Sequence, residues 1–299
     1  MASSRLLFVD TNIWLDFYRS RTEAGLSLLR HLEVVKDRII MTYQVEMEFK
    51  RNRQFVIFDS FQALKPPSDI PNPRMFSDAK TAKALAKDLK NAEKRIKALK
   101  KRLQRALDDP THSDLVYQIC QRCFHKTDNI TLSRDTDVKR RIKRQAFRRF
   151  IYGCPPRKKD DTSIGDAINW EWIIECANAC PSEIHIVSRD ADYGITVEGK
   201  SYLNDHLWQE FKERVSKKRS VFLHTKLSEA LKKFAIAVSS EEEKEETEIL
   251  QIKPTLPALN EESIRHFREW QSLSSWIDKI SAESKTSASV TVRTAPTDQ

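Results

Sequence analysis

Glycine is scarce in this sequence, and its scarcity narrows the range of folds. Only 5 of the 299 residues are glycine, whereas 32% are Asp, Glu, Lys or Arg. All-β sandwiches and barrels are built from many short strands joined by glycine-rich turns, so they are disfavoured. Few glycines and many charges are more typical of helix-rich α/β proteins. The length suits one large domain or two small ones with a sizeable core.

Cysteine pairs and long apolar runs are missing as well. The 5 cysteines are odd in number and irregularly spaced, which argues against a disulfide scaffold. Cys120, Cys123 and His125 resemble half of a zinc knuckle, but no second half follows, so buried reduced thiols are the favoured interpretation. No apolar stretch approaches the roughly 18 residues of a membrane span, and the opening MASSRLLFV is too short for a signal peptide. We therefore expect a cytoplasmic protein without membrane association.

Positive charge outweighs negative charge, with 52 Lys and Arg against 43 Asp and Glu and a formal net charge of +9. A charge of this sign indicates a polyanionic partner but does not identify a reaction. Residues 77–107 are rich in lysine, and their apolar residues recur at the alternating spacing of a heptad seam. We expect a basic helical hairpin whose seam packs on a following helix at about 112–125. Its lysine-rich faces are candidates for contact with nucleic acid or with an acidic protein partner.

Short β-branched runs alternate with helical stretches along most of the chain. Such alternation predicts βαβ units and a parallel sheet. Strands are predicted at residues 5–10, 38–42, 183–188 and 220–225, with helices between them. The expected organisation is a first part of the main domain at 1–76, a helical insertion at 77–126, a second part of the main domain at 127–238 and a C-terminal region at 239–299.

The C-terminal region differs in composition from the rest. The acidic run SSEEEKEETE begins after Val238 and is expected to be a solvated linker. Residues 260–281 carry their apolar side chains on one helical face, so this amphipathic helix is expected to dock on the body or to bind a protein partner. The last residues, SAESKTSASVTVRTAPTDQ, have the composition of a disordered tail.

The stretch RLLFVDTN ends a buried strand on an acid, Asp10. One interpretation is that Asp10 caps the following helix, because Asp is a preferred N-cap residue. Another is that it serves a ligand, since open α/β sheets bind ligands at the carboxyl ends of their strands. Asp190 and Asp192 follow the strand at 183–188 in the same way. Capping explains each acid separately, but it does not explain why two strands end in acids at one edge of one sheet.

Two further acids lie on helix faces that we expect to be packed. Glu48 shares a face with Phe49, whereas Glu46 lies on the other side and can pair with Lys50. A carboxylate on a buried face needs a partner, either an arginine or a metal ion. Asp166 stands in the first turn of a helix, where it also suits the helix dipole. Clustered carboxylates of this kind select hard cations such as Mg²⁺ or Mn²⁺.

Four motifs in this order carry a family resemblance: FVDTN, QVEMEFKRNR, PPRKKDDTSIGDAINW and IVSRDADYG. Together they resemble the PIN-domain nucleases, and most closely a bacterial PIN-like branch with a helical insertion. The resemblance covers roughly residues 5–65 and 145–237. It implies an α/β fold in three layers with a central parallel sheet, interrupted by the basic helical hairpin and followed by a C-terminal tail. The sheet would carry an acidic pocket at its strand ends.

The resemblance also implies roles for individual residues. Asn12 would orient the first carboxylate, and Asp192 would be an auxiliary metal ligand. The catalytic and metal-binding acids would be Asp10, Glu48, Asp166 and Asp190, and the candidates for substrate phosphate contact are Lys158, Lys159 and Arg149.

The implied activity is metal-dependent hydrolysis of phosphodiester bonds by an endonuclease, leaving a 5′-phosphate and a 3′-hydroxyl. RNA is the favoured substrate, in a setting such as a toxin, antiviral defence or RNA maintenance. One alternative is a structure-specific DNA nuclease, and another is a non-cleaving RNA-binding adaptor. A phosphatase of the DxD type is disfavoured because the second position holds Asn12. The presence of all four acids argues against the adaptor.

Overall fold

The computed structural model describes residues 4–65, 80–133, 137–157 and 163–251. The chain divides into two units, Met1–Lys253 and Pro254–Gln299, and all described residues belong to the first. The predicted amphipathic helix at 260–281 and the predicted disordered tail therefore lie outside the described residues. No helix in the described ranges is both long and apolar enough to cross a membrane.

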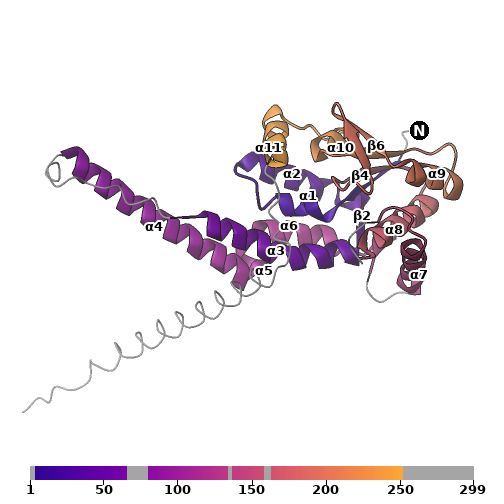
Figure 1. The fold of residues 1–299 in the computed structure, drawn as a ribbon, viewed down its shortest axis with the longest axis horizontal. Helices are drawn as coiled ribbons and strands as arrows, with labels where there is room; N and C mark the ends of the chain where they lie inside the picture. Colours follow the sequence, from indigo (N-terminus) through magenta and orange to yellow (C-terminus); the bar gives the residue numbers. More distant parts are fainter. Residues whose placement is uncertain (1–3, 66–79, 134–136, 158–162, 252–299) are drawn as a thin grey trace, which may run out of the picture. The chain divides into compact units, whose positions relative to one another are not determined.

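A five-stranded parallel sheet forms the centre of this unit (Figure 1). Its strand order is β3-β2-β1-β4-β7, and each neighbouring pair is parallel. The strands are β1 (Ser4–Val9), β2 (Ile39–Thr42), β3 (Thr131–Leu132), β4 (Ser182–Val187) and β7 (Val221–His224). The predicted α/β class with a parallel sheet is confirmed, and the short edge strand β3 is an addition to it.

The central strands are covered on both faces. Successive strand residues point to opposite faces, and the four residues Leu6–Val9 are all buried. Helix α8 (Gly165–Ala179) contacts β2 and β4, while α10 (Leu227–Lys233) contacts β4 and β7. The continuous apolar run at residues 6–9 predicts a strand that is buried on both faces, and β1 is such a strand.

Most other helices lie where their patterns predict them. The expected helix at 13–35 is divided into α1 (Thr11–Asp16) and α2 (Glu23–Val34), at the break that the polar residues 19–22 suggest. The remaining helices of the body are α3 (Tyr43–Ala63), α5 (Pro110–Ser113), α6 (Leu115–Phe124), α7 (Asp137–Ile151) and α9 (Asp205–Arg214), with a short 3₁₀ turn η1 (Lys36–Arg38).

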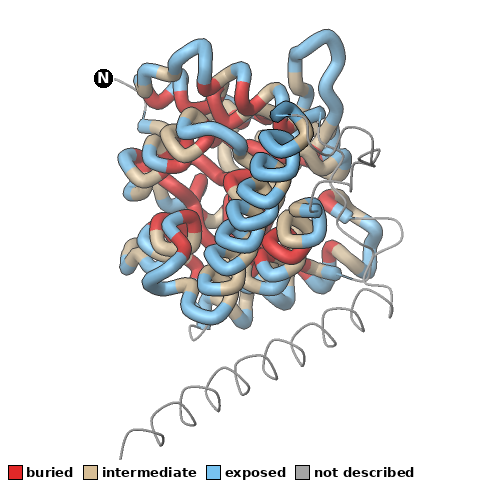
Figure 2. Tube along the Cα trace, turned by 90° about the vertical axis from the view of Figure 1, so that its left-hand side faces the viewer, coloured by how far each residue is buried: buried red, intermediate tan, exposed pale blue. Residues whose placement is uncertain are grey.

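The basic segment forms a single long helix, α4 (Lys80–Asp108), that extends away from the sheet (Figure 1). Its 29 residues correspond to about 44 Å at 1.5 Å per residue. None of them is buried, so the helix is exposed or half-buried along its length (Figure 2). The helix contacts α3 and α5, whereas the expected partner at 112–125, now α6, packs on α2 and β2. The prediction of a helix was correct, but α6 is not its principal partner among the described residues.

Arg53 holds the base of this long helix to the body. Its guanidinium is 3% exposed and donates hydrogen bonds to Asp114 Oδ2 at 2.6 and 2.9 Å. It also donates to the carbonyl oxygen of Ala106, near the C-terminal end of α4. Removal of one partner from a buried ion pair such as Arg53–Asp114 costs about 3–5 kcal/mol. Because Arg53 is held in this pair and also bonds Ala106, it fixes where the helix leaves the body.

One predicted helix is partly wrong. The sequence KSYLNDHLWQEFKERV at residues 200–215 predicts a helix throughout, but Lys200–Leu203 form β6, which pairs with β5 (Gly194–Val197) in an antiparallel hairpin. The turn residues Glu198 and Gly199 both have positive φ, at 49° and 78°. A tight two-residue hairpin turn requires that backbone conformation at both positions. The helix α9 begins only after Asn204, whose side chain accepts a hydrogen bond from His206 N.

The acidic run after Val238 is also different from the expected solvated linker. Residues Ser240–Gln251 form helix α11, and Glu245 and Glu246 are buried. Glu245 accepts hydrogen bonds from the backbone of Arg21 and Thr22, at the start of α2. Glu246 accepts from Ser228 N, at the start of α10. Carboxylates are stabilised at helix N-termini, so these glutamates fold the run into a docked helix.

Candidate functional site

Asp10 stands at the carboxyl end of β1, and the capping role that the sequence suggested is observed. It is the N-cap residue of α1, where Oδ1 accepts a 2.7 Å hydrogen bond from Thr11 N. Its other oxygen, Oδ2, accepts from Ser188 Oγ at 2.7 Å. Ser188 directly follows β4, the neighbouring parallel strand. The cap therefore fixes the carboxylate at the edge where the ends of β1 and β4 meet.

The electrostatic environment of Asp10 disfavours its charged form. Burial raises the pKa of this carboxyl from 3.8 to about 6. The hydrogen bonds from Ser188 and Thr11 lower the pKa, but the negative charges of Glu48 and Asp190 raise it further. The three carboxylates are thus close enough to repel one another, and a cation between them would relieve the repulsion.

Glu48 lies in the second turn of α3 and faces the same edge. Its oxygens accept hydrogen bonds from Thr11 Oγ1 at 3.0 Å and from Gln44 Nε2 at 2.7 Å. Gly165, at the start of α8, comes so close that an added Cβ would lie 2.5 Å from Glu48 Oε1. A larger residue at position 165 would require the side chains of Glu48 and Gln44 to shift.

Glu46 points elsewhere, as its helix phase predicts. Its Oε1 pairs with Lys50 Nζ at 2.5 Å, and it also contacts His125 Nε2 at 2.9 Å. The predicted Glu46–Lys50 pair is therefore confirmed. Glu46 and Glu48 are two residues apart on a helix and consequently occupy different faces.

Three more acids form a compact group. Asp166 lies in the first turn of α8, and Asp190 and Asp192 follow β4. One carboxylate oxygen from each lies within 4.8 Å of the others, a spacing that suits a divalent cation. The loop is ordered by its own backbone, since Asp190 N donates to Ser188 Oγ and Asp192 N donates to Asp190 Oδ1, both at 3.1 Å. Ser188 thereby links this group to Asp10.

Tyr193 lies among these acids and was not predicted from the sequence. Its side chain is fully buried, and within the described ranges its hydroxyl has no hydrogen-bond partner. Burial raises the pKa of the phenol well above its usual value, and nearby negative charge adds to the effect. The carboxylates responsible for that charge are Asp166, Asp10, Asp190 and Glu48. The hydroxyl thus has all four predicted acids around it.

Other predicted site residues take different positions. Asn12 lies on α1, but the hydrogen bonds to Asp10 in the described part of the chain come from Thr11 and Ser188. Arg149 is 6% exposed and donates to Glu171, Glu210 and the carbonyl of Pro155. This guanidinium is committed to a buried ion-pair network, so we do not assign it a phosphate contact. Lys158 and Lys159 lie outside the described residues.

The zinc-like cysteines are part of the core. Cys120 and Cys123 are buried free thiols on α6, and burial raises the pKa of Cys123 to about 12. His125 contacts Glu46 instead. In the portion of the chain that the structure covers, the group of Asp166, Asp190 and Asp192 has metal-ligand spacing and the cysteines do not take part in one.

Several residues that shape the site gave no usable signal in the sequence. Small polar residues such as Thr11, Gln44 and Ser188 are common beside strands and helices for many reasons. Their role depends on contacts between segments far apart in the chain. Gly165 was the clearest available hint, because a glycine at a helix start in a glycine-poor chain indicates close approach of another group.

Comparison with known families agrees with this geometry. The PIN domain family model matches residues 7–193, which is more than half of the chain. The chain therefore belongs to the PIN domain family, and this membership indicates a phosphodiester hydrolase that acts on nucleic acid. Searches of curated proteins and of solved structures found no match.

Proposed function

We propose that this protein is a metal-dependent endonuclease whose preferred substrate is RNA. The observation that carries the proposal is the convergence of five acids on one edge of a parallel sheet in a PIN domain. They are Asp10, Glu48, Asp166, Asp190 and Asp192. Burial raises the pKa of Asp10, and the negative charges of Glu48 and Asp190 raise it further, as expected where carboxylates are gathered.

The residues present fit Mg²⁺ or Mn²⁺. All the candidate ligands are carboxylate oxygens, which hard cations prefer. Asp166, Asp190 and Asp192 would hold the cation, with Asp10 and Glu48 completing the site from the other side. When bound, such a cation lowers the pKa of a water molecule and stabilises charge on the scissile phosphate. Thr11, Gln44 and Ser188 hold the two flanking carboxylates in fixed orientations.

The buried hydroxyl of Tyr193, which has no hydrogen-bond partner among the described residues, supports a site that a bound cation and its water molecules complete. A buried hydroxyl without a partner costs about 1–3 kcal/mol. Tyr193→Phe should therefore leave the metal-free protein at least as stable, because it removes that unsatisfied group. We expect the hydroxyl to gain a partner at the site only when the cation is bound, so the substitution should lower the affinity for Mn²⁺ by about tenfold. Thermal unfolding and isothermal titration of Mn²⁺ check both parts, and a less stable variant with unchanged Mn²⁺ affinity would refute this role.

The long helix α4 supplies charge for a polyanionic substrate. All of its lysines except Lys100 are exposed, and its 8 lysines and 3 arginines face only 3 acids, so pairs along the helix cannot neutralise most of its charge. We expect it to contribute phosphate contacts that do not depend on base sequence.

Replacement of five lysines on α4 by glutamine should weaken RNA binding and flatten its salt dependence. The positions are Lys87, Lys90, Lys94, Lys97 and Lys101. Glutamine is a good helix former, so the helix should persist in circular dichroism. Each lost phosphate contact lowers the slope of log affinity against log salt by roughly 0.7–0.9. Unchanged binding and slope would assign α4 to packing or to a protein partner.

A cleavage assay tests the proposed function directly. Labelled single-stranded RNA, single-stranded DNA and flapped duplex DNA would be incubated with Mg²⁺, Mn²⁺ or EDTA. We expect RNA cleavage with either metal, none with EDTA, and 5′-phosphate products. Preferential cutting of the flapped duplex would identify a DNA nuclease instead. Tight RNA binding without cleavage under any condition would favour the non-cleaving adaptor.

A further inference from the structure

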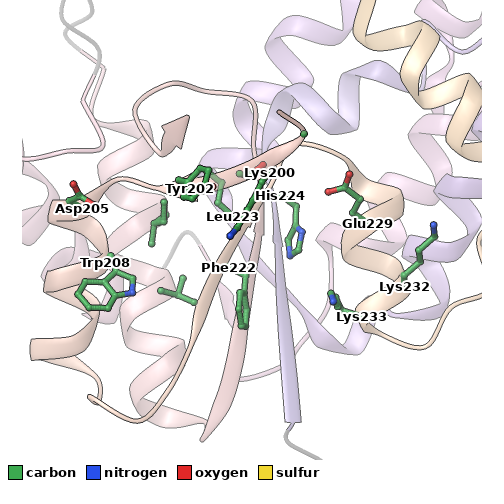
Figure 3. Close-up of a pocket in the computed structure, with 14 residues that line it drawn as sticks. Lys200, Tyr202, Asp205, Trp208, Phe222, Leu223, His224, Glu229, Lys232 and Lys233 are labelled. Atoms are coloured by element: carbon green, nitrogen blue, oxygen red, sulfur yellow. The ribbon is translucent and has the colours of Figure 1, made fainter. Parts of the chain in front are cut away.

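A wide groove lies beside the acidic site and has no part in the chemistry proposed above. It has a volume of about 960 Å³ and runs along β7, the edge strand of the sheet. Strand β6 and helix α9 border it on one side, and helix α10 borders it on the other (Figure 3). Because the groove lies at an edge of the sheet, it is accessible from solvent.

The groove presents large aromatic faces to solvent. Tyr202, Trp208 and Phe222 line it, and they are 47%, 51% and 43% exposed. They come from β6, α9 and β7, three separate elements that meet here (Figure 3). Exposed aromatic residues gathered in this way mark interaction sites more often than isolated ones do.

Lysines accompany the aromatic rings. Lys200 lines the groove, and its Nζ lies 5.2 Å from the ring centroid of Tyr202. Lys212 is not in the lining, but its Nζ lies 5.6 Å from the ring centroid of Trp208 and donates to the carbonyl oxygens of Lys217 and Arg219. Lys233 also lines the groove, from α10 (Figure 3). The acids in the lining are Asp205 and Glu229, and burial raises the pKa of Glu229. The surface therefore combines stacking faces with positive charge.

The groove is joined to the acidic site through the backbone. His224, which lines the groove, accepts a 3.0 Å hydrogen bond on its carbonyl oxygen from Ser188 N. Ser188 in turn donates to Asp10. On the other side, the β5–β6 hairpin begins at Gly194, directly after Tyr193. Residues that line the groove are thus bonded directly to the loop that carries Asp190 and Asp192.

We propose that this groove binds single-stranded nucleic acid next to the site of cleavage, with bases stacked on Trp208 and Tyr202. The proposal rests on the proposed nuclease function, which it extends by a substrate-binding surface. Aromatic faces accept any base, while lysines attract the phosphates, so the pair of features is typical of single-strand recognition. A peptide that adds a strand to β7 is a different occupant, but it needs the strand edge rather than exposed rings and lysines.

Binding of a fluorescein-labelled 12-nucleotide oligouridine, measured by anisotropy in EDTA, separates recognition from cleavage. The Trp208→Ala/Tyr202→Ala double variant should bind roughly tenfold or more weakly, because each stacked base contributes substantially. Trp208→Phe keeps a stacking face and should retain most of the affinity. Tyr152→Ala is the matched control, since Tyr152 is 79% exposed on another part of the surface. Thermal unfolding verifies that all variants are folded.

The same variants, assayed for cleavage, separate the groove from the nuclease. We expect the double variant to raise KM for RNA and to leave kcat almost unchanged. If it binds and cleaves like the wild type, the groove proposal is wrong, the nuclease stands, and a strand-adding peptide becomes the better occupant. If the wild type binds through the groove but cleaves no substrate with any metal, the nuclease proposal fails and the groove stands. If the wild type does not bind the oligonucleotide, the groove proposal is overturned.

Discussion

Asp10→Asn is expected to abolish metal-dependent cleavage and to stabilise the metal-free protein. The substitution removes a negative charge from a buried position where Glu48 and Asp190 already repel it. An asparagine oxygen can still accept the hydrogen bond from Thr11 N that caps α1. The fold should therefore persist, while the site loses a ligand of the charge that a cation requires.

The gain in stability should depend on pH in a specific direction. Because the pKa of Asp10 is raised from 3.8 to about 6 in the folded state, the metal-free wild type loses stability as the pH rises between these values. The loss is complete above about pH 6 and corresponds to at most about 3 kcal/mol. Asp10→Asn escapes it, so the two proteins should be equally stable near pH 4 and differ most above pH 6.

Urea unfolding in EDTA at pH 4, 5, 6 and 7.5 measures this difference, and a cleavage assay with Mn²⁺ measures the activity. Asp37→Asn is a suitable control, since Asp37 is exposed on η1 and should change neither quantity. Full activity in folded Asp10→Asn protein would eliminate Asp10 from the catalytic site. A stability difference that does not change with pH would mean that the folded protein does not raise the pKa of Asp10.

Glu48→Gln should inactivate the protein, whereas Glu46→Gln should be nearly silent. Glu48 faces Asp10 and is held by Thr11 and Gln44, and a glutamine oxygen can keep one of those hydrogen bonds. Glu46 lies on the other face and pairs with Lys50 and His125. A surface pair of this kind contributes less than about 1 kcal/mol. The two substitutions thus remove the same charge, two residues apart, with opposite consequences.

The contrast is measured by cleavage rate and by Mn²⁺ affinity under identical conditions. Glu48→Gln should reduce both, and Glu46→Gln should reproduce the wild type in both. The opposite result would place the active face of α3 on the other side of the helix. Equal loss in both variants would point to a general effect of charge on α3 rather than to a ligand.

The sequence predicted the sheet and the acids because each depends on a short pattern. The apolar run at 6–9 and the acid after it form a pattern only a few residues long. Helical periodicity predicts which side chains of α3 share a face. These signals placed Asp10, Glu48, Asp166 and Asp190 in one region, and Tyr193 now lies among them. The role of Asn12 stays a prediction, as do the domain boundaries at 76, 126 and 238.

What the sequence did not predict depends on contacts between distant segments. The glutamates of α11 are indistinguishable from solvated ones until the starts of α2 and α10 are placed beside them. Ser188 and Tyr193 likewise acquire their roles from β1 and α8. The β5–β6 hairpin is a different case, since its turn at Glu198 and Gly199 carried a local signal that the helical pattern of the following residues outweighed.

The docked helix α11 shows that the end of the family match and the end of the compact unit are two different boundaries. The family match ends at residue 193, yet β7 pairs with β4, and α11 satisfies backbone groups at the starts of α2 and α10. Residues 194–251 thus lie beyond the family match but inside the compact unit Met1–Lys253. A fragment ending at 193 would expose the edge of β4 and leave those helix starts uncapped. For this chain, the family match and the compact unit therefore have different end points, and a fragment cut to the match would lack part of the sheet.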